Sequence, residues 1–178
     1  MLSRRLKRKD IHPKSIFEST IVSVYSDDVD LLDSSLYALN LAIGLKRQTK
    51  KQVIVVDAAA TGGVVFEALQ LDACSGFLPL GKFFHAQDVN SKIIRHQKGI
   101  DVLRVSFGER EKFDTALLVS ILTLLANDYH YCIVVLTSDY APEVFKVLSQ
   151  SDVVHLLVAP DASKVEQMFA AMDKSGVW

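Results

Sequence analysis

The feature that most constrains the fold is a set of short, almost wholly apolar runs that are rich in β-branched residues. Each run has four to six residues, and none alternates regularly between apolar and polar positions. This pattern is typical of strands that are buried on both faces of a parallel sheet. His155 interrupts the last run, so we expect its strand to be less fully covered. The five runs are Thr20–Tyr25, Val53–Val56, Val102–Val105, Ile133–Leu136 and Val153–Val158.

Between these runs, apolar residues recur at spacings of three and four, which is typical of helices that pack one face on a core. Lys46 and Arg47 stand near the end of the first such stretch, and Pro160-Asp161 supplies a start signal for the last. Because strands and helices alternate, the sequence predicts a doubly wound α/β domain with a mainly parallel sheet. The predicted helices lie around Leu36–Arg47, Leu117–Leu125, Val144–Leu148 and Val165–Met172, with a further one at Gln87–His96 in the less regular middle.

Composition limits the classes of function. The 178 residues suffice for one domain, and a net charge of −1 creates no general attraction to nucleic acid or an anionic membrane. Two distant cysteines, Cys74 and Cys132, and the lack of any apolar run of about 18 residues favour a cytoplasmic protein. Cys132, in an apolar run, is expected to be a small buried hydrophobe.

The chain divides into a basic N-terminal tail, 1–18, and a domain, 19–178. A fold of this kind usually adds a strand after the last helix, so we expect a domain that is trimmed or lacks its last strand. The tail is either solvated or able to touch the inner membrane face, a nucleic acid or an acidic partner. Its cations are Arg4, Arg5, Lys7, Arg8 and Lys9.

The loop after the first run is the first place to look for a site, because α/β folds bind ligands at the carboxyl ends of their strands. It carries four carboxylates, at Asp27, Asp28, Asp30 and Asp33. The simplest interpretation is helix capping, with Asp33 or a following serine as the N-cap. A divalent cation site is the alternative, although Leu32 and the lack of a glycine rule out an EF-hand loop.

An ordered series of segments resembles the MinD/ParA family of P-loop ATPases over about residues 19–175. The loop has the length of that family's Walker A motif, K-G-G-x-G-K-[ST]-[ST], and it is followed by a helix similar to the family's L-A-x-N-L-A. No gap is needed to match them. The matching segments are the loop and helix at 28–42, Val53–Ala58 as the D-x-D strand, Tyr129–Leu136 as the Walker B strand, and Ser151–Asp161 as a later strand and turn.

On this match, the residue types that bind phosphate are missing from the loop. Glycines let a P-loop curl its backbone N–H groups around phosphate, and lysines supply positive charge. One charge pair at about 4 Å contributes on the order of 4 kcal/mol near a protein surface, so reversing two of them costs several kcal/mol of affinity. The match puts Val29, Asp30 and Leu32 at the glycine positions, Asp28 and Asp33 at the lysine positions, and Leu31 at the variable one.

The other nucleotide motifs have also changed. Val135 stands at the Walker B aspartate and Ala59 at the second acid of D-x-D, while Asp57, Ser34 and Ser35 remain. Losing three motifs together argues against phosphoryl transfer, which depends on positioned cations. We therefore expect no catalytic residue, bound cofactor or metal.

The resemblance implies a non-catalytic pseudo-ATPase scaffold, since MinD/ParA proteins position bacterial machines as ATP-dependent dimers. The expected partner is a protein, either an active paralogue or a second copy of this chain, in a cell-envelope, motility or polysaccharide-export machine. No specific nucleic acid is expected. Two alternatives stay open: a weak ATPase that a partner completes, and a receiver-like signalling module that uses Asp57.

Several other residues gave weaker signals. His85, His96 and His130 lack the spacing of a metal site and are expected at the surface or in loops. The phenylalanines Phe77, Phe83 and Phe84 are either core or an exposed partner site.

Overall fold

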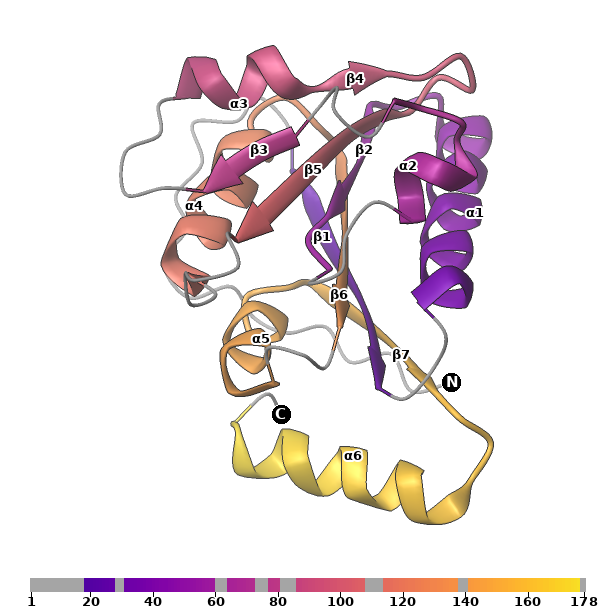
Figure 1. Cartoon of the computed structure of the whole chain (residues 1–178), viewed down its shortest axis with the longest axis vertical. Coiled ribbons are helices and arrows are strands. Elements are labelled where there is room, and N and C mark those ends of the chain that lie inside the picture. Colours follow the sequence, from indigo (N-terminus) through magenta and orange to yellow (C-terminus); the bar gives the residue numbers. More distant parts are fainter. Residues whose placement is uncertain are drawn as a thin grey trace.

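The computed structural model describes residues 18–27, 31–59, 64–72, 77–80, 86–107, 114–137 and 141–176, and strands alternate with helices along it (Figure 1). The strands are β1 Thr20–Asp27, β2 Val53–Asp57, β3 Phe77–Leu80, β4 Ile94–Arg95, β5 Asp101–Phe107, β6 Tyr131–Thr137 and β7 Val153–Val158. The helices are α1 Leu31–Thr49, α2 Val64–Ala68, α3 Ala86–Lys92, α4 Thr115–Leu125, α5 Ala141–Leu148 and α6 Ala162–Lys174.

The strands form one sheet in the order β3-β5-β2-β6-β1-β7, and each of these neighbours is parallel. Only β4 departs from this, because it pairs antiparallel with the start of β5. The predicted doubly wound, mainly parallel fold is therefore confirmed.

Helices cover both faces of the sheet, and each face has its own apolar cluster. On one face α1 and α2 pack with Val24, Val55 and Val135. On the other, α3, α4, α5 and α6 pack with residues that include Val56 and Leu136. Figure 1 shows α1 and α2 on one side of the sheet and α3, α4 and α5 on the other.

All five predicted strands are present. β2 is buried along its whole length, and β6 from Cys132 onward, which confirms the buried interpretation of their apolar runs, Cys132 included. Every residue of β7 is half-buried, as expected from His155, because β7 lies at the end of the sheet. Asp161 caps α6 by accepting hydrogen bonds from Ser163 N and Lys164 N, as its position predicted.

The predicted helix at Gln87–His96 is only partly correct. α3 ends at Lys92, and the next residues form β4 against β5. Helical spacing alone could not show this, because the antiparallel partner of Ile94 is Val102, in the next strand. The tail at 1–17, His85, Phe83 and Phe84 lie outside the described residues.

Candidate functional site

The site that the sequence singled out lies where β1, β2 and β6 end and α1 begins. In a parallel sheet these carboxyl ends share one edge. The strand register puts Asp57 opposite Val135 and Ser26 opposite Thr137. We call the group formed by Ser26, Ser34, Ser35, Asp57 and Thr137 the strand-end cluster; all five side chains are buried.

α1 begins earlier than the sequence suggested. It starts at Leu31, so Asp33 lies within its first turn and is exposed, while Ser34 and Ser35 are wholly buried. The prediction that Asp33 or a serine is the N-cap is therefore wrong, because these residues are already helical. Asp33 still places negative charge near the positive end of the helix dipole. Asp28, Val29 and Asp30 fall outside the described residues, as do the side chains of Asp27, Leu31 and Leu32.

Asp57 ends β2 and turns its carboxylate back to its own chain. Its Oδ1 accepts a hydrogen bond from Ala59 N at 3.4 Å, and its side chain is 1% exposed. Ala58 N donates to Val135 O at 3.1 Å, which holds this turn against β6. The position that matches the second acid of D-x-D is the buried methyl group of Ala59.

Val135 is part of the apolar core. It is wholly buried, lies between Val24 and Asp57 in register, and packs in the cluster under α1. An aspartate at this position would need water or a cation, and a valine can bind neither. The site at β6 therefore has the chemistry of a packed interior.

Positive charge is also missing from the segments that lead into the site. The sequence holds no lysine or arginine at 15–45, 52–81 or 113–145, and these stretches contain β1, β2, β6 and the start of α1. Phosphate binding relies on ammonium or guanidinium groups and on a curled glycine backbone. These segments therefore offer no cationic side chain to a phosphate group.

Within the described residues, no group of three or more His, Cys, Asp or Glu side chains is arranged to hold a metal ion. The acidic loop lies largely outside those residues, so a divalent site there stays a hypothesis. Ser35 Oγ is buried and has no hydrogen-bond partner in the described part of the chain.

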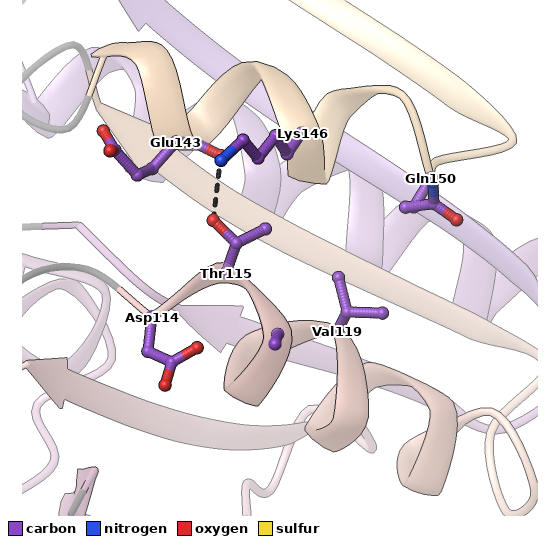
Figure 2. Close-up of a pocket in the computed structure, with 7 residues that line it drawn as sticks. Asp114, Thr115, Val119, Glu143, Lys146 and Gln150 are labelled. Carbon is purple, nitrogen blue, oxygen red and sulfur yellow. Dashed lines mark hydrogen bonds between the residues drawn. The ribbon is translucent and has the colours of Figure 1, made fainter.

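Two cavities lie away from the strand-end cluster. One, of about 660 Å³, runs between α4 and α5, where Thr115 Oγ1 donates to the Glu143 carbonyl at 3.3 Å (Figure 2). The other, of about 460 Å³, lies near the start of β5. The first is lined by Asp114, Thr115, Ala116, Val119, Glu143, Lys146 and Gln150, and the second by Asn90, Ile93, Arg95, Asp101, Asp128 and Tyr129.

The second cavity contains an interaction that the sequence did not reveal. Tyr129 Oη donates to Asp101 Oδ2 at 2.8 Å, and both residues are buried. Arg95 Nε approaches Asp101 Oδ1 at 3.4 Å, although the Arg95 side chain is 81% exposed. Burial, followed by the hydrogen bond to Asp101, raises the pKa of the Tyr129 phenol well above its ordinary value.

A second missed interaction joins α1 to the last strand. Tyr37 Oη and His155 Nδ1 are 2.5 Å apart, and their rings are in tilted contact. Burial lowers the pKa of His155 below its ordinary value. His130, for which the sequence predicted a surface or loop position, lies in a bend before β6, and burial again lowers its pKa. His96 is in a loop but buried.

Comparison with known proteins shows the fold. The sequence matches no family model, and no curated protein is significantly similar to it. Solved structures with a similar fold include the chimerical protein CapA2B2 (TM-score 0.69, 13% identity, covering 90% of this chain and 73% of that one). Others are the kinase domain of the Escherichia coli tyrosine kinase ETK (TM-score 0.65, 18% identity, 90% and 64%) and a plasmid partition protein from Borrelia burgdorferi (TM-score 0.61, 14% identity, 89% and 74%).

These identities are low, so the likeness concerns the fold and not the activity. Among the described residues, no helix is both long and apolar enough to cross a membrane. The chain is thus a mainly parallel α/β domain with the P-loop NTPase-like fold of a tyrosine kinase domain and a plasmid partition protein.

Proposed function

We propose that this protein is a non-catalytic scaffold with a degenerate nucleotide site, which recruits or positions a protein partner in a bacterial cell-envelope, motility or polysaccharide-export machine. The observation that carries the proposal is the strand-end cluster. It keeps the buried hydroxyls and Asp57 of a nucleotide site, but no lysine or arginine lies in the segments that form it.

The fold is compatible with this proposal, but it does not distinguish a positioning protein from an enzyme. The same architecture occurs in a tyrosine kinase domain and in a plasmid partition protein, so it is compatible with either chemistry or positioning. The site favours positioning, because Val135 fills the core where magnesium chemistry needs an acid. The partner is a protein, either an active paralogue or a second copy of this chain.

Calorimetric titration with MgATP and with MgADP tests the proposal. We expect no saturable binding, which corresponds to a dissociation constant above about 1 mM. A dissociation constant in the micromolar range for either nucleotide would overturn the proposal.

Two variants that replace an aspartate by lysine test whether positive charge at the start of α1 increases the affinity for phosphate groups. Asp33→Lys puts an ammonium group on an exposed position in the first turn of α1, and we expect it to increase polyphosphate affinity several-fold. Asp88→Lys makes the same change at an exposed position in the first turn of α3 and should have no effect. Equal effects of the two variants would mean that affinity follows net charge and not this site.

A weak ATPase that a partner completes is the second candidate, and it is supported by the burial of Ser34 and Asp57 at the matching positions. ATP turnover with and without the paralogue distinguishes the two. Turnover that appears only with the paralogue and disappears in Ser34→Ala would establish this candidate.

The receiver-like alternative needs an accessible acceptor carboxylate. Asp57 is 1% exposed and ends the second strand in chain order, and receiver domains place the acceptor after the third. We therefore expect beryllofluoride to leave the NMR spectrum unchanged.

A further inference from the structure

Positive charge is concentrated where the parallel strands begin, at the opposite end of the sheet from the strand-end cluster. The turn from α1 to β2 and the turn from β4 to β5 both lie there, because each leads into the start of a parallel strand. The stretches 45–52 and 92–100, which contain these turns, have no aspartate or glutamate. Their cations are Lys46, Arg47, Lys50, Lys51, Lys92, Arg95 and Lys98.

The two turns are in contact. A Cβ atom at Gly99 would lie 3.3 Å from Lys46 Cε, so the β4–β5 turn packs on the Lys46 side chain, and Figure 1 shows this turn beside the last turn of α1. His130, just before β6, joins the same place because its backbone N donates to Gln52 O at 3.0 Å. We call the side chains of five residues the basic surface: Lys46, Arg47, Lys50, Lys51 and Lys98.

The charge of the basic surface is not neutralised within the described part of the chain. Its side chains are exposed apart from that of Lys46, which is half-buried, and none forms an ion pair with a described carboxylate. Lys46 Nζ donates to two neutral oxygens, Lys51 O at 3.0 Å and Gln52 Oε1 at 3.3 Å. Burial, and then the charges of Lys51 and Lys46, lower the pKa of His130 below its ordinary value. The surface is therefore open to an external anion.

Lys50 occupies a backbone position that favours glycine. Its φ is 59°, in the left-handed region, and its backbone N donates to Lys46 O at 3.0 Å as α1 ends. Glycine is the usual residue at such a helix end, because a Cβ atom disfavours positive φ. Lysine is therefore the less stable choice here, and strained residues of this kind are found at functional positions.

We infer that the basic surface docks on an anionic lipid bilayer, with the cations of the tail at 1–18 as a second contact. The tail joins the domain at this end of the sheet, because β1 begins at Thr20, whose backbone N donates to His130 O at 2.8 Å. Lysines and arginines held near a bilayer are attracted by its anionic headgroups, and their contributions add up.

The residue types favour a bilayer over a nucleic acid. In the tail, Leu2, Leu6 and Ile11 alternate with the cations, and apolar residues among cations are typical of segments that lie in the membrane interface. Single-stranded nucleic acids are bound by aromatic side chains that stack on bases. Of the described residues, the large apolar side chains that are exposed are Leu36 and Phe169, and neither lies on these two turns.

The distribution of charge favours one orientation on the bilayer. The stretches 1–18, 45–52 and 92–100 hold 13 of the 20 lysines and arginines, but only Asp10 and Glu18 of the 21 acidic residues. The remainder of the chain is consequently acidic, although the net charge of the whole is only −1. An anionic bilayer attracts the basic surface and repels the rest, so it orients the protein.

This inference goes beyond the proposed function and does not depend on it. The strand-end cluster lies where the strands end, whereas the basic surface lies where they begin. A nucleotide-binding result of either sign leaves the inference standing, and a protein that ignores vesicles leaves the scaffold proposal standing.

Co-sedimentation of the full chain with lipid vesicles tests the inference, using a matched pair of double variants. Lys50→Glu with Lys51→Glu reverses two charges of the basic surface. Lys146→Glu with Lys174→Glu makes the same change at exposed positions on α5 and α6, away from the end of α1 (Figure 1). Circular dichroism confirms that each variant folds.

We expect the wild type to bind vesicles of equimolar phosphatidylcholine and phosphatidylserine, and not vesicles of phosphatidylcholine alone. Reversing Lys50 and Lys51 should weaken binding by at least about tenfold, and the control pair should weaken it much less. Added salt should weaken binding, because it screens exposed charges.

Lys50→Gly separates loss of charge from loss of folding. It removes one ammonium group and suits the positive φ of this position, so the variant should unfold at no lower urea concentration than the wild type while binding about fivefold more weakly.

Four results would overturn the inference. These are a wild type that does not bind the anionic vesicles, binding that does not require phosphatidylserine, and binding that the Lys50 and Lys51 reversal leaves unchanged, which would assign it to the tail alone. The fourth is tighter binding to short duplex DNA or to polyglutamate than to the vesicles, which would assign the surface to another polyanion.

Discussion

Replacing Tyr129 by phenylalanine tests the buried interaction at the start of β5. The substitution keeps the ring and removes only the hydroxyl that donates to Asp101 Oδ2 at 2.8 Å. Asp101 is 6% exposed, so the substitution leaves a largely buried carboxylate oxygen without this donor. A hydrogen bond to a charged group contributes about 1.5–3 kcal/mol, so we expect the free energy of unfolding to fall by that amount.

Arg95→Ala is the matched control, since Arg95 contacts the other oxygen of the same carboxylate. Its side chain is 81% exposed, and exposed ion pairs contribute about 0–1 kcal/mol. Urea unfolding at pH 7, monitored by circular dichroism, gives the change in unfolding free energy for each variant, provided that the free energy depends on urea concentration with the same slope in both. The reasoning is refuted if Tyr129→Phe is as stable as the wild type, or if Arg95→Ala costs more than Tyr129→Phe.

The wild type and Tyr129→Phe can also be compared as a function of pH. Burial, followed by the bond to Asp101, raises the pKa of Tyr129 above its ordinary value of 10.0, so the folded state keeps a proton that the unfolded chain releases. The stabilisation is therefore complete below about pH 10 and is lost as the pH rises above it. The difference in stability between wild type and Tyr129→Phe should shrink above pH 10, whereas a constant difference would contradict this assignment.

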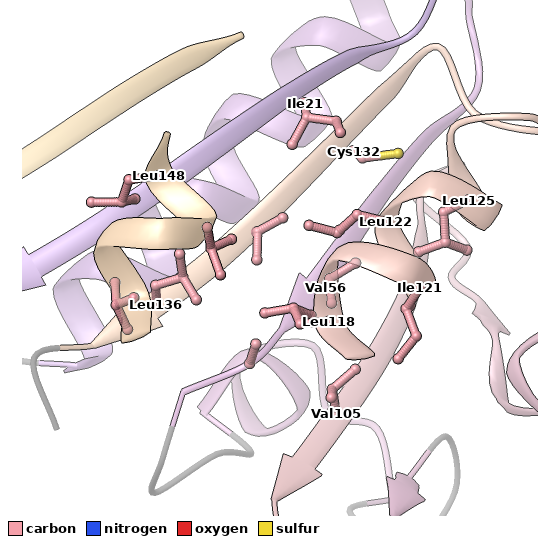
Figure 3. Close-up of a cluster of buried hydrophobic side chains, with 14 of the residues drawn as sticks. Ile21, Val56, Val105, Leu118, Ile121, Leu122, Leu125, Cys132, Leu136 and Leu148 are labelled. Carbon is pink, nitrogen blue, oxygen red and sulfur yellow. The ribbon is translucent and has the colours of Figure 1, made fainter. Parts of the chain in front are cut away.

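Two further predictions concern the edge strand and the core. Burial lowers the pKa of His155, so the stability that its neutral form contributes is present above pH 6.5 and is lost as the pH falls below that value. His155→Gln should therefore flatten the acid side of the profile of stability against pH, measured by urea unfolding. A profile that the substitution leaves unchanged would count against this assignment. Leu118 is wholly buried on the sheet face of α4 (Figure 3), so Leu118→Ala should lower the free energy of unfolding by about 2–5 kcal/mol. Leu36 is 40% exposed, so Leu36→Ala should lower it by less than about 1 kcal/mol. Equal losses of stability in thermal and urea unfolding would contradict the burial of Leu118.

Local sequence determined five of the seven described strands and most helices, but it did not predict β3 and β4. Runs such as Val53–Val56 are apolar at every position, and a strand is the short element that can bury both of its faces in this way. The lack of cationic side chains in the stretch 15–45 also follows from the sequence alone, because it does not depend on how the chain folds.

Tertiary structure decided which side chains of the candidate site are buried and where some elements begin and end. The sequence could not show that α1 begins at Leu31, so that Ser34 and Ser35 are buried helical residues near its start. The sequence also could not show where α3 ends and β4 begins. Ile94 and Arg95 form a strand only because they pair with the backbone of β5.

The same distinction explains β7 and its contacts. The runs Thr20–Tyr25 and Val153–Val158 look alike in sequence, yet β1 lies inside the sheet and β7 at its edge. Tyr37 and His155 are 118 positions apart, and Tyr129 and Asp101 are 28 apart. Sequence patterns report the periodicity of a single segment, whereas these pairings follow from the order of strands in the sheet, which depends on the packing of the whole chain.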